Sequence, residues 1–199
     1  KNFVYTEENL NEISFPLGGI GSGSIGLAGN GRLIDWEIFN RPAKGTANGF
    51  SHFAIKAENK NGLVDARILH GDLNPPYSGA LAEAPFGNFG FGPARSTLAG
   101  VPHFSQCTFT GKYPVAELAF DTPSFPGQVT LTAFNPLIPL NDKDSSIPAA
   151  FFEIACRNTS TEFLEFTIAG VCTNPFPGQP TGKNTDDIKS VNQSVNTGG

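Results

Sequence analysis

The sequence predicts a mainly β protein, an antiparallel β-sandwich with one short N-terminal helix. Many short segments alternate apolar and polar residues with a period of two, as strands with one buried face do. The 199 residues include 23 Gly and 16 Pro spread along the chain, which is typical of short elements joined by tight turns. Long helical periodicity between these segments is missing from the sequence, which argues against a helical bundle or a parallel sheet.

The helix is predicted in the segment YTEENLNEI near the N-terminus. Thr6 is a typical N-cap residue, and Glu7 and Glu8 follow it where carboxylates complement the helix dipole. Leu10 and Ile13 would then share one apolar face. We therefore expect a short helix that begins at Thr6.

The next element is a strand in the segment RLIDWEIF. Strict alternation places Ile34, Trp36 and Ile38 on the core face and turns Asp35 and Glu37 toward solvent. Other segments alternate in the same way. They are HFAIKAE (52–58), LVDARIL (63–69), FSQCTFT (104–110), VAELAF (115–120) and QVTLTAF (128–134).

The last two strands are predicted to form a hairpin. AAFFEIACR (149–157) and FLEFTIAGV (163–171) are both rich in β-formers, and the polar link NTSTE (158–162) between them is short.

Two segments fall outside this pattern. Residues 70–102 are rich in Gly, Pro and Phe and are expected to form long loops across the ends of the sandwich. Residues 177–199 are polar and are interpreted as a flexible tail or a cut point. The β-sandwich domain is therefore assigned to residues 1–176.

Charge and composition limit the classes of partner that we expect for this chain. The net charge is −5 and Lys and Arg form no run, so nucleic acid is not an expected partner. The sequence has no apolar stretch long enough for a membrane span, and no signal peptide is visible. Because the chain begins at Lys1 and contains no Met, we interpret it as a processed or trimmed piece, and its compartment stays unassigned.

The segment GSGSIG carries the G-x-G-x-x-G spacing of dinucleotide-binding folds at Gly21, Gly23 and Gly26. That fingerprint needs a helix directly after it, whose N-terminal amides hold the pyrophosphate. Here the hairpin signal Asn30-Gly31 and a strand follow instead. We therefore predict a glycine-rich β-segment and no nucleotide cofactor.

Asp35 and Glu37 are the most tempting acid/base pair. Residues two apart on a strand share a face, and retaining glycosidases use two carboxyl groups about 5–5.5 Å apart. Any solvent-facing strand also produces such pairs, so the pattern favours a surface role. Trp36 points to the opposite face and is expected in the core rather than as a platform for a sugar ring.

Metal and nucleophile signals are weak. The acidic turn at Asp142, Asp144 and Ser145 lacks the Gly and Glu of a calcium loop and is expected to be a solvated turn. The histidines and cysteines show no metal-ligand or disulfide spacing, so no metal and no cofactor are predicted. They are His52, His70 and His103, and Cys107, Cys156 and Cys172.

Several longer stretches together resemble one known family. ISFPLGGIGSGSIGLAGNGRLIDWEIFNRP (13–42) resembles the opening of the N-terminal domain of glycoside hydrolase family 116, the family of bacterial β-glucosidases and the non-lysosomal glucosylceramidase. NGFSHFAIKAE (48–58), RILHGDLNPPYSG (67–79) and FNPLIPLNDKDSSIPAAFFEIACRNTS (134–160) extend the resemblance to about residue 176.

The resemblance implies an N-terminal β-sandwich followed by a large (α/α)₆ catalytic domain that hydrolyses β-glucosides with retention. The Glu nucleophile and the Asp acid/base of the family belong to that helical domain, which is expected to lie outside this chain. No catalytic residue is therefore assigned here. The family's sandwich is longer than this stretch, so its last strands are expected to be missing.

The resemblance makes the chain a non-catalytic support for the helical domain. Asp35, Glu37 and Arg41 are then candidates for the interface or the rim of the pocket. Such a domain should show an exposed apolar patch or an unpaired sheet edge where its neighbour docks.

Two alternatives stay open. An independent carbohydrate-binding module would use exposed aromatic residues, and the candidates are Phe89 and Phe91 with Tyr77 and Phe86. A self-contained hydrolase would use the carboxylates of Asp35 and Glu37.

Overall fold

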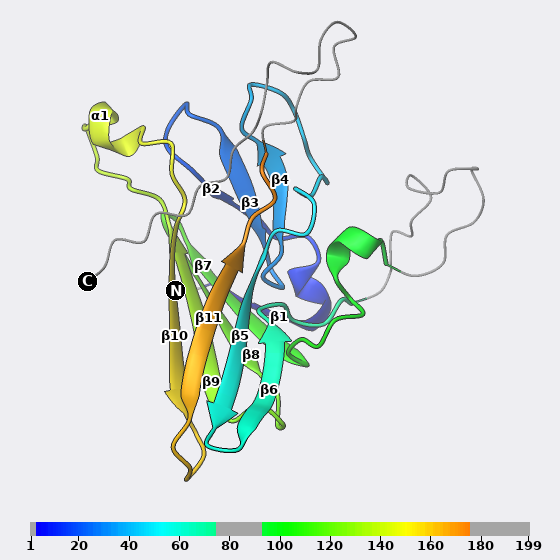
Figure 1. The fold of residues 1–199 in the computed structure, drawn as a ribbon. Coiled ribbons are helices and arrows are strands. Elements are labelled where there is room, and N and C mark those ends of the chain that lie inside the picture. The colour runs from blue at the N-terminus through cyan, green and yellow to red at the C-terminus, as the bar shows by residue number, and fades with distance from the viewer. Residues whose placement is uncertain (1–2, 75–92, 176–199) are drawn as a thin grey trace, which may run out of the picture.

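The structure is a computed structural model that describes residues 3–74 and 93–175, and it is a sandwich of antiparallel sheets (Figure 1). One layer is a five-stranded sheet in the order β1-β7-β8-β9-β10. Two three-stranded sheets, β11-β5-β6 and β2-β3-β4, make up the rest of the sheet structure. The predicted mainly β fold class is confirmed.

The bounds of the elements are as follows. The five-stranded sheet contains β1 (Phe3–Thr6), β7 (Gln106–Lys112), β8 (Val115–Asp121), β9 (Gly127–Phe134) and β10 (Phe151–Asn158). The smaller sheets contain β5 (His52–Asn59), β6 (Gly62–Ile68) and β11 (Glu165–Val171), and β2 (Ser14–Leu17), β3 (Ser24–Ala28) and β4 (Leu33–Glu37). The described helical segments are single turns, namely η1 (Glu7–Leu10), η2 (Arg95–Thr97) and α1 (Asp142–Ser145).

The core lies between the sheets, and alternation in the central strands sets its composition. In β9, the side chains of Val129, Leu131 and Ala133 are buried, as the sequence predicted. In β5, Ile55 and Ala57 are buried on the face predicted for them. All of these residues belong to one hydrophobic cluster that joins the three sheets.

The predicted short N-terminal helix is present as the 3₁₀ turn η1, with Thr6 at the N-cap position, and only its extent is smaller than the expected stretch to Ile13, so that part of the prediction is wrong. The residues before Glu7 form β1, in which Thr6 pairs with Thr108 of β7, and only one 3₁₀ turn follows. The Thr6 side chain makes no capping hydrogen bond. Leu10 is buried in the core and Ile13 packs against it, as the predicted apolar face requires.

The predicted hairpin of the last two strands is also wrong. β10 pairs with β9, and β11 pairs with β5 in another sheet. The link between them crosses the bottom edge of the sandwich (Figure 1). The aromatic rings of Phe53 and Phe152 then meet between the layers, with centroids 4.9 Å apart. A short polar link is compatible with either connection, and core packing selects the crossing one.

β4 departs from strict alternation at Asp35. The register places Leu33 opposite Leu27 but shifts between Gly26 and Ser24, and Asp35 has a φ of +50°. The extra residue is a β-bulge. Leu33 and Trp36 therefore contact the core while Ile34 lies opposite Gly26, so the predicted shared face of Ile34 and Trp36 is wrong.

Candidate functional site

The three glycines of the G-x-G-x-x-G spacing shape the β2–β3 hairpin and its neighbours. Gly21 has a φ of +71° in the turn, and Gly23 has a φ of +90° with its Cα against β4. A Cβ atom on Gly23 would lie 2.9 Å from the Glu37 carbonyl oxygen, and one on Gly26 would lie 2.3 Å from Ser14 Oγ. The motif runs into β3, which contains Gly26, so a strand stands where a dinucleotide site would need a helix.

Asp35 is buried and fully engaged, in contrast to the predicted solvent exposure. Ser14 Oγ donates to Asp35 Oδ2 over 2.6 Å, and the Gly45 amide donates to Oδ1 over 2.6 Å. The Lys44 ammonium lies 3.2 Å from Oδ2. The bulge turns this carboxylate toward the segment that follows β4, which covers it.

Glu37 shares the same cation. Lys44 Nζ lies 3.3 Å from Glu37 Oε2, and the Ala43 amide donates to Oε1 over 3.2 Å. The two carboxylates that the sequence singled out are thus brought together by Lys44. The sequence reasoning missed this residue because it lies outside the strand, in the loop.

The electrostatics of Asp35 favour the ionised form. Burial by itself would raise the pKa of this carboxyl, but the hydrogen bonds from Ser14, Gly45 and Lys44 together lower it below its ordinary value. The pKa of Lys44 is raised, first by its hydrogen bond to Asp35 and then by that to Glu37. The arrangement stabilises the loop that carries Lys44. Because Asp35 favours its ionised form, it is a poor proton donor.

The loop is tied to β4 by its backbone as well. The Asp35 amide donates to the Thr46 carbonyl over 2.9 Å, and Ile34 forms an isolated antiparallel bridge with Ala47. Thr46 and Ala47 therefore pair with the edge of the small sheet, and the contacts of Lys44 and Gly45 with Asp35 hold the loop there.

Arg41 lies beyond this cluster and is exposed. It borders a hollow of about 660 Å³ that is lined by Gly21–Gly23 and Glu37–Pro42. Of the three predicted interface residues, Arg41 is thus the one whose charged group faces outward, and its role at an interface stays a prediction.

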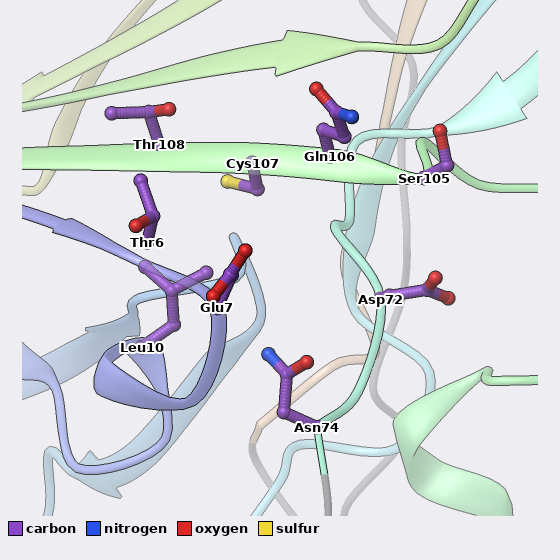
Figure 2. Close-up of a pocket in the computed structure, with 9 residues that line it drawn as sticks. All are labelled: Thr6, Glu7, Leu10, Asp72, Asn74, Ser105, Gln106, Cys107 and Thr108. Carbon is purple, nitrogen blue, oxygen red and sulfur yellow. The ribbon is translucent and has the colours of Figure 1, made fainter.

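A second hollow, of about 410 Å³, lies where β1 and η1 meet β7 (Figure 2). Glu7 and Asp72 both line it, but Asp72 points away from Glu7 and its Oδ1 lies 2.6 Å from His103 Nε2. Burial raises the pKa of the Cys107 thiol to about 12, so this sulfur stays protonated and is a poor nucleophile. The lining residues do not form an acid/base pair.

The fold gathers histidines that are far apart in the sequence. The rings of His52 and His70 are 6.5 Å apart, and His70 and His103 line the same pocket of about 210 Å³. Burial, assisted by the nearby Arg32 guanidinium, lowers the pKa of His70 to about 3. Both ring nitrogens of His70 are buried without a hydrogen-bond partner.

The remaining sequence candidates divide into two groups. The acidic turn forms α1, where Asn141 Oδ1 accepts from the Asp144 amide over 3.1 Å, and Ser145 is buried. The aromatic candidates of a carbohydrate-binding module, including Phe89 and Phe91, lie outside the described residues.

Across residues 3–74 and 93–175, no group of three or more His, Cys, Asp or Glu side chains could hold a metal ion. No helix in the same part of the chain is both long and apolar enough to cross a membrane.

Comparison with known proteins identifies the family. Residues 14–198 match the family model described as beta-glucosidase 2, glycosyl-hydrolase family 116 N-term. No curated protein matches the chain. The family match covers most of the sequence, including the glycine-rich hairpin, β4 and the Lys44 loop. The chain therefore belongs to the N-terminal domain family of the glycoside hydrolase family 116 β-glucosidases.

Proposed function

We propose that this chain is a non-catalytic β-sandwich that supports the helical catalytic domain of a retaining β-glucosidase or glucosylceramidase-like enzyme. The observation that carries the proposal is the Lys44 bridge between Asp35 and Glu37. In this proposal, the most conspicuous carboxylate pair of the chain stabilises the fold and does not take part in catalysis.

The chemistry of glycoside hydrolysis supports this assignment. A retaining enzyme needs one carboxylic acid with a raised pKa as proton donor and one free carboxylate as nucleophile. The pKa of Asp35 is shifted in the opposite direction, and Glu37 shares the same lysine. An enzyme of this type would need its two carboxylates elsewhere, as the resemblance to family 116 implies for the helical domain.

The first test is hydrolysis of a chromogenic β-glucoside by the full chain at high protein concentration. We expect no turnover above a buffer control, while circular dichroism verifies that the protein is folded. Turnover that the Asp35→Asn variant abolishes and the Glu117→Gln variant retains would overturn the proposal. Glu117 is a suitable control because it is an exposed carboxylate on β8.

The same preparation tests the alternative of a carbohydrate-binding module. Binding of a soluble β-glucan by this chain, lost in the Phe89→Ala/Phe91→Ala double variant, would favour the module. Absence of binding would leave the supporting role as the better account.

A further inference from the structure

One end of the sandwich presents four exposed aliphatic side chains on two adjoining loops. They are Ile20 in the β2–β3 loop and three residues around α1, and we call them the apical aliphatic surface. Their exposed fractions are 56% for Ile20, 48% for Ile138, 107% for Leu140 and 42% for Ile147. Figure 1 shows α1 and the β2–β3 connection together at the top of the molecule.

Ser145, which is buried, connects these two loops. Ser145 Oγ donates to the Ile138 carbonyl over 3.0 Å and accepts from the Ile138 amide over 2.9 Å. The Ser145 carbonyl accepts from the Ile20 amide over 2.8 Å. One buried residue thus fixes the backbone of two members of the surface relative to each other.

A second anchor ties the surface to the sheets. The Gly18 amide donates to Asn135 Oδ1 over 2.7 Å, and Asn135 Nδ2 donates to the Pro16 carbonyl over 2.8 Å. The backbones also touch, because a Cβ atom on Gly19 would lie 2.3 Å from the Ile147 carbonyl oxygen. The backbone that carries Ile20 and Ile147 is therefore held against the sheets.

Leu140 has an unfavourable backbone conformation. Its φ is +65°, a conformation that costs a non-glycine residue about 1 kcal/mol or more. Its side chain is fully exposed, so burial does not offset that cost. Backbone strain of this kind concentrates at functional sites. Asn adopts a positive φ more readily than Leu does, and its polar side chain would be hydrated at this exposed position.

We propose that the apical aliphatic surface is the docking site for the helical catalytic domain, through an aliphatic helix face on that domain. This inference rests on the proposed function. The hollow lined by Arg41 and Glu37 adjoins this surface at Gly21, next to Ile20. Neither surface contains Asp35, because this residue is buried.

Two observations favour a domain of the same polypeptide over a second copy of this chain. A stable interface between separate molecules buries about 800 Å² on each partner, more than four aliphatic side chains supply. A tethered domain needs less area because its effective concentration is high. The described chain also runs from β11 toward this end of the sandwich (Figure 1).

The test compares Leu140→Asn with Phe163→Asn, in this chain alone and in the full-length family 116 enzyme that carries it. Phe163 is a matched control because it is 90% exposed at the opposite end, in the link between β10 and β11. In the chain alone, Leu140→Asn should keep or raise Tm. In the full-length enzyme it should lower Tm by about 3 °C or more and separate the unfolding of the two domains. Phe163→Asn should not do so.

Two results would overturn the docking site. One is a full-length enzyme in which Leu140→Asn and Phe163→Asn have equal effects. The other is a dimer of the isolated chain, detected by sedimentation equilibrium, that Leu140→Asn dissociates, since a second copy would then be the occupant. Turnover of the glucoside by the isolated chain would contradict the proposed function instead, and the assay distinguishes the two failures.

Discussion

Lys44 Nζ lies 3.2 Å from Asp35 Oδ2 and 3.3 Å from Glu37 Oε2, so a single cation bridges the two carboxylates of the bulged strand β4. The Gly45 amide and Ser14 hydroxyl complete the contacts of Asp35. The loop that supplies Lys44 is thereby attached to the edge of the small sheet. The stability of this loop should depend on the charge of Asp35.

The Asp35→Asn variant should lower the free energy of unfolding by about 1–3 kcal/mol at neutral pH, because it removes the buried carboxylate that accepts charge-assisted hydrogen bonds from Ser14 and the Gly45 amide. Denaturant unfolding measures this change. Glu117→Gln should stay within about 0.5 kcal/mol of the wild-type chain, as exposed substitutions do. Equal stability of Asp35→Asn and wild type would mean that the cluster contributes little.

The pH dependence of this effect has a definite sign. The pKa of Asp35 is lower in the folded chain than its ordinary value near 4, so its stabilisation is complete above that value. The stabilisation should be lost as the pH falls below about 4 toward the folded pKa. The difference between wild type and Asp35→Asn should shrink over that range, and a constant difference would contradict the assignment.

His70 should destabilise the fold in acid. Its folded pKa of about 3 lies below the ordinary 6.5, so the unfolded chain binds a proton between these values and the folded chain does not. Stability should fall by up to about 1.4 kcal/mol for each pH unit between 6.5 and 3. His70→Leu should flatten this slope, whereas His52→Gln should retain it. Thermal unfolding at several pH values provides the measurement.

The glycine motif allows a matched comparison. Gly21→Ala should cost about 1 kcal/mol, because Gly21 has a positive φ but its Cβ would meet open space. Gly23→Ala adds contacts of 2.9 Å with the Glu37 carbonyl oxygen and Ile38 Cα, so it should cost at least about 1 kcal/mol more. Urea unfolding of both variants tests this order, and the reverse order would show that packing against β4 is not the reason for Gly23.

Much of the fold follows from local sequence. Period-two alternation locates most of the strands and identifies the buried residues Val129 and Leu131, because a half-buried strand fixes which side chains face the core. The Asn30-Gly31 signal likewise predicts the turn before β4, where Gly31 has a φ of +93°. The absence of a helix after Gly26 was enough to argue against a dinucleotide site.

Other features depend on residues that are distant in sequence. Thr6 lies in β1 because β7 is there to pair with it, and the strands on either side of residues 158–162 join different sheets because each has another partner. Strand pairing is a long-range interaction, and a local segment carries little information about its partner.

The sequence by itself determined a mainly β chain and a resemblance to the family 116 N-terminal domain, both of which were confirmed. Only the tertiary structure decided the ionisation of Asp35, because the pKa of its carboxyl depends on contacts with Ser14 and Lys44 from other segments. It also decided that Ile20 and Leu140 form one exposed surface, since Ser145 joins their loops. Local periodicity reports which residues are apolar, whereas contacts across the fold determine which of them are left exposed together.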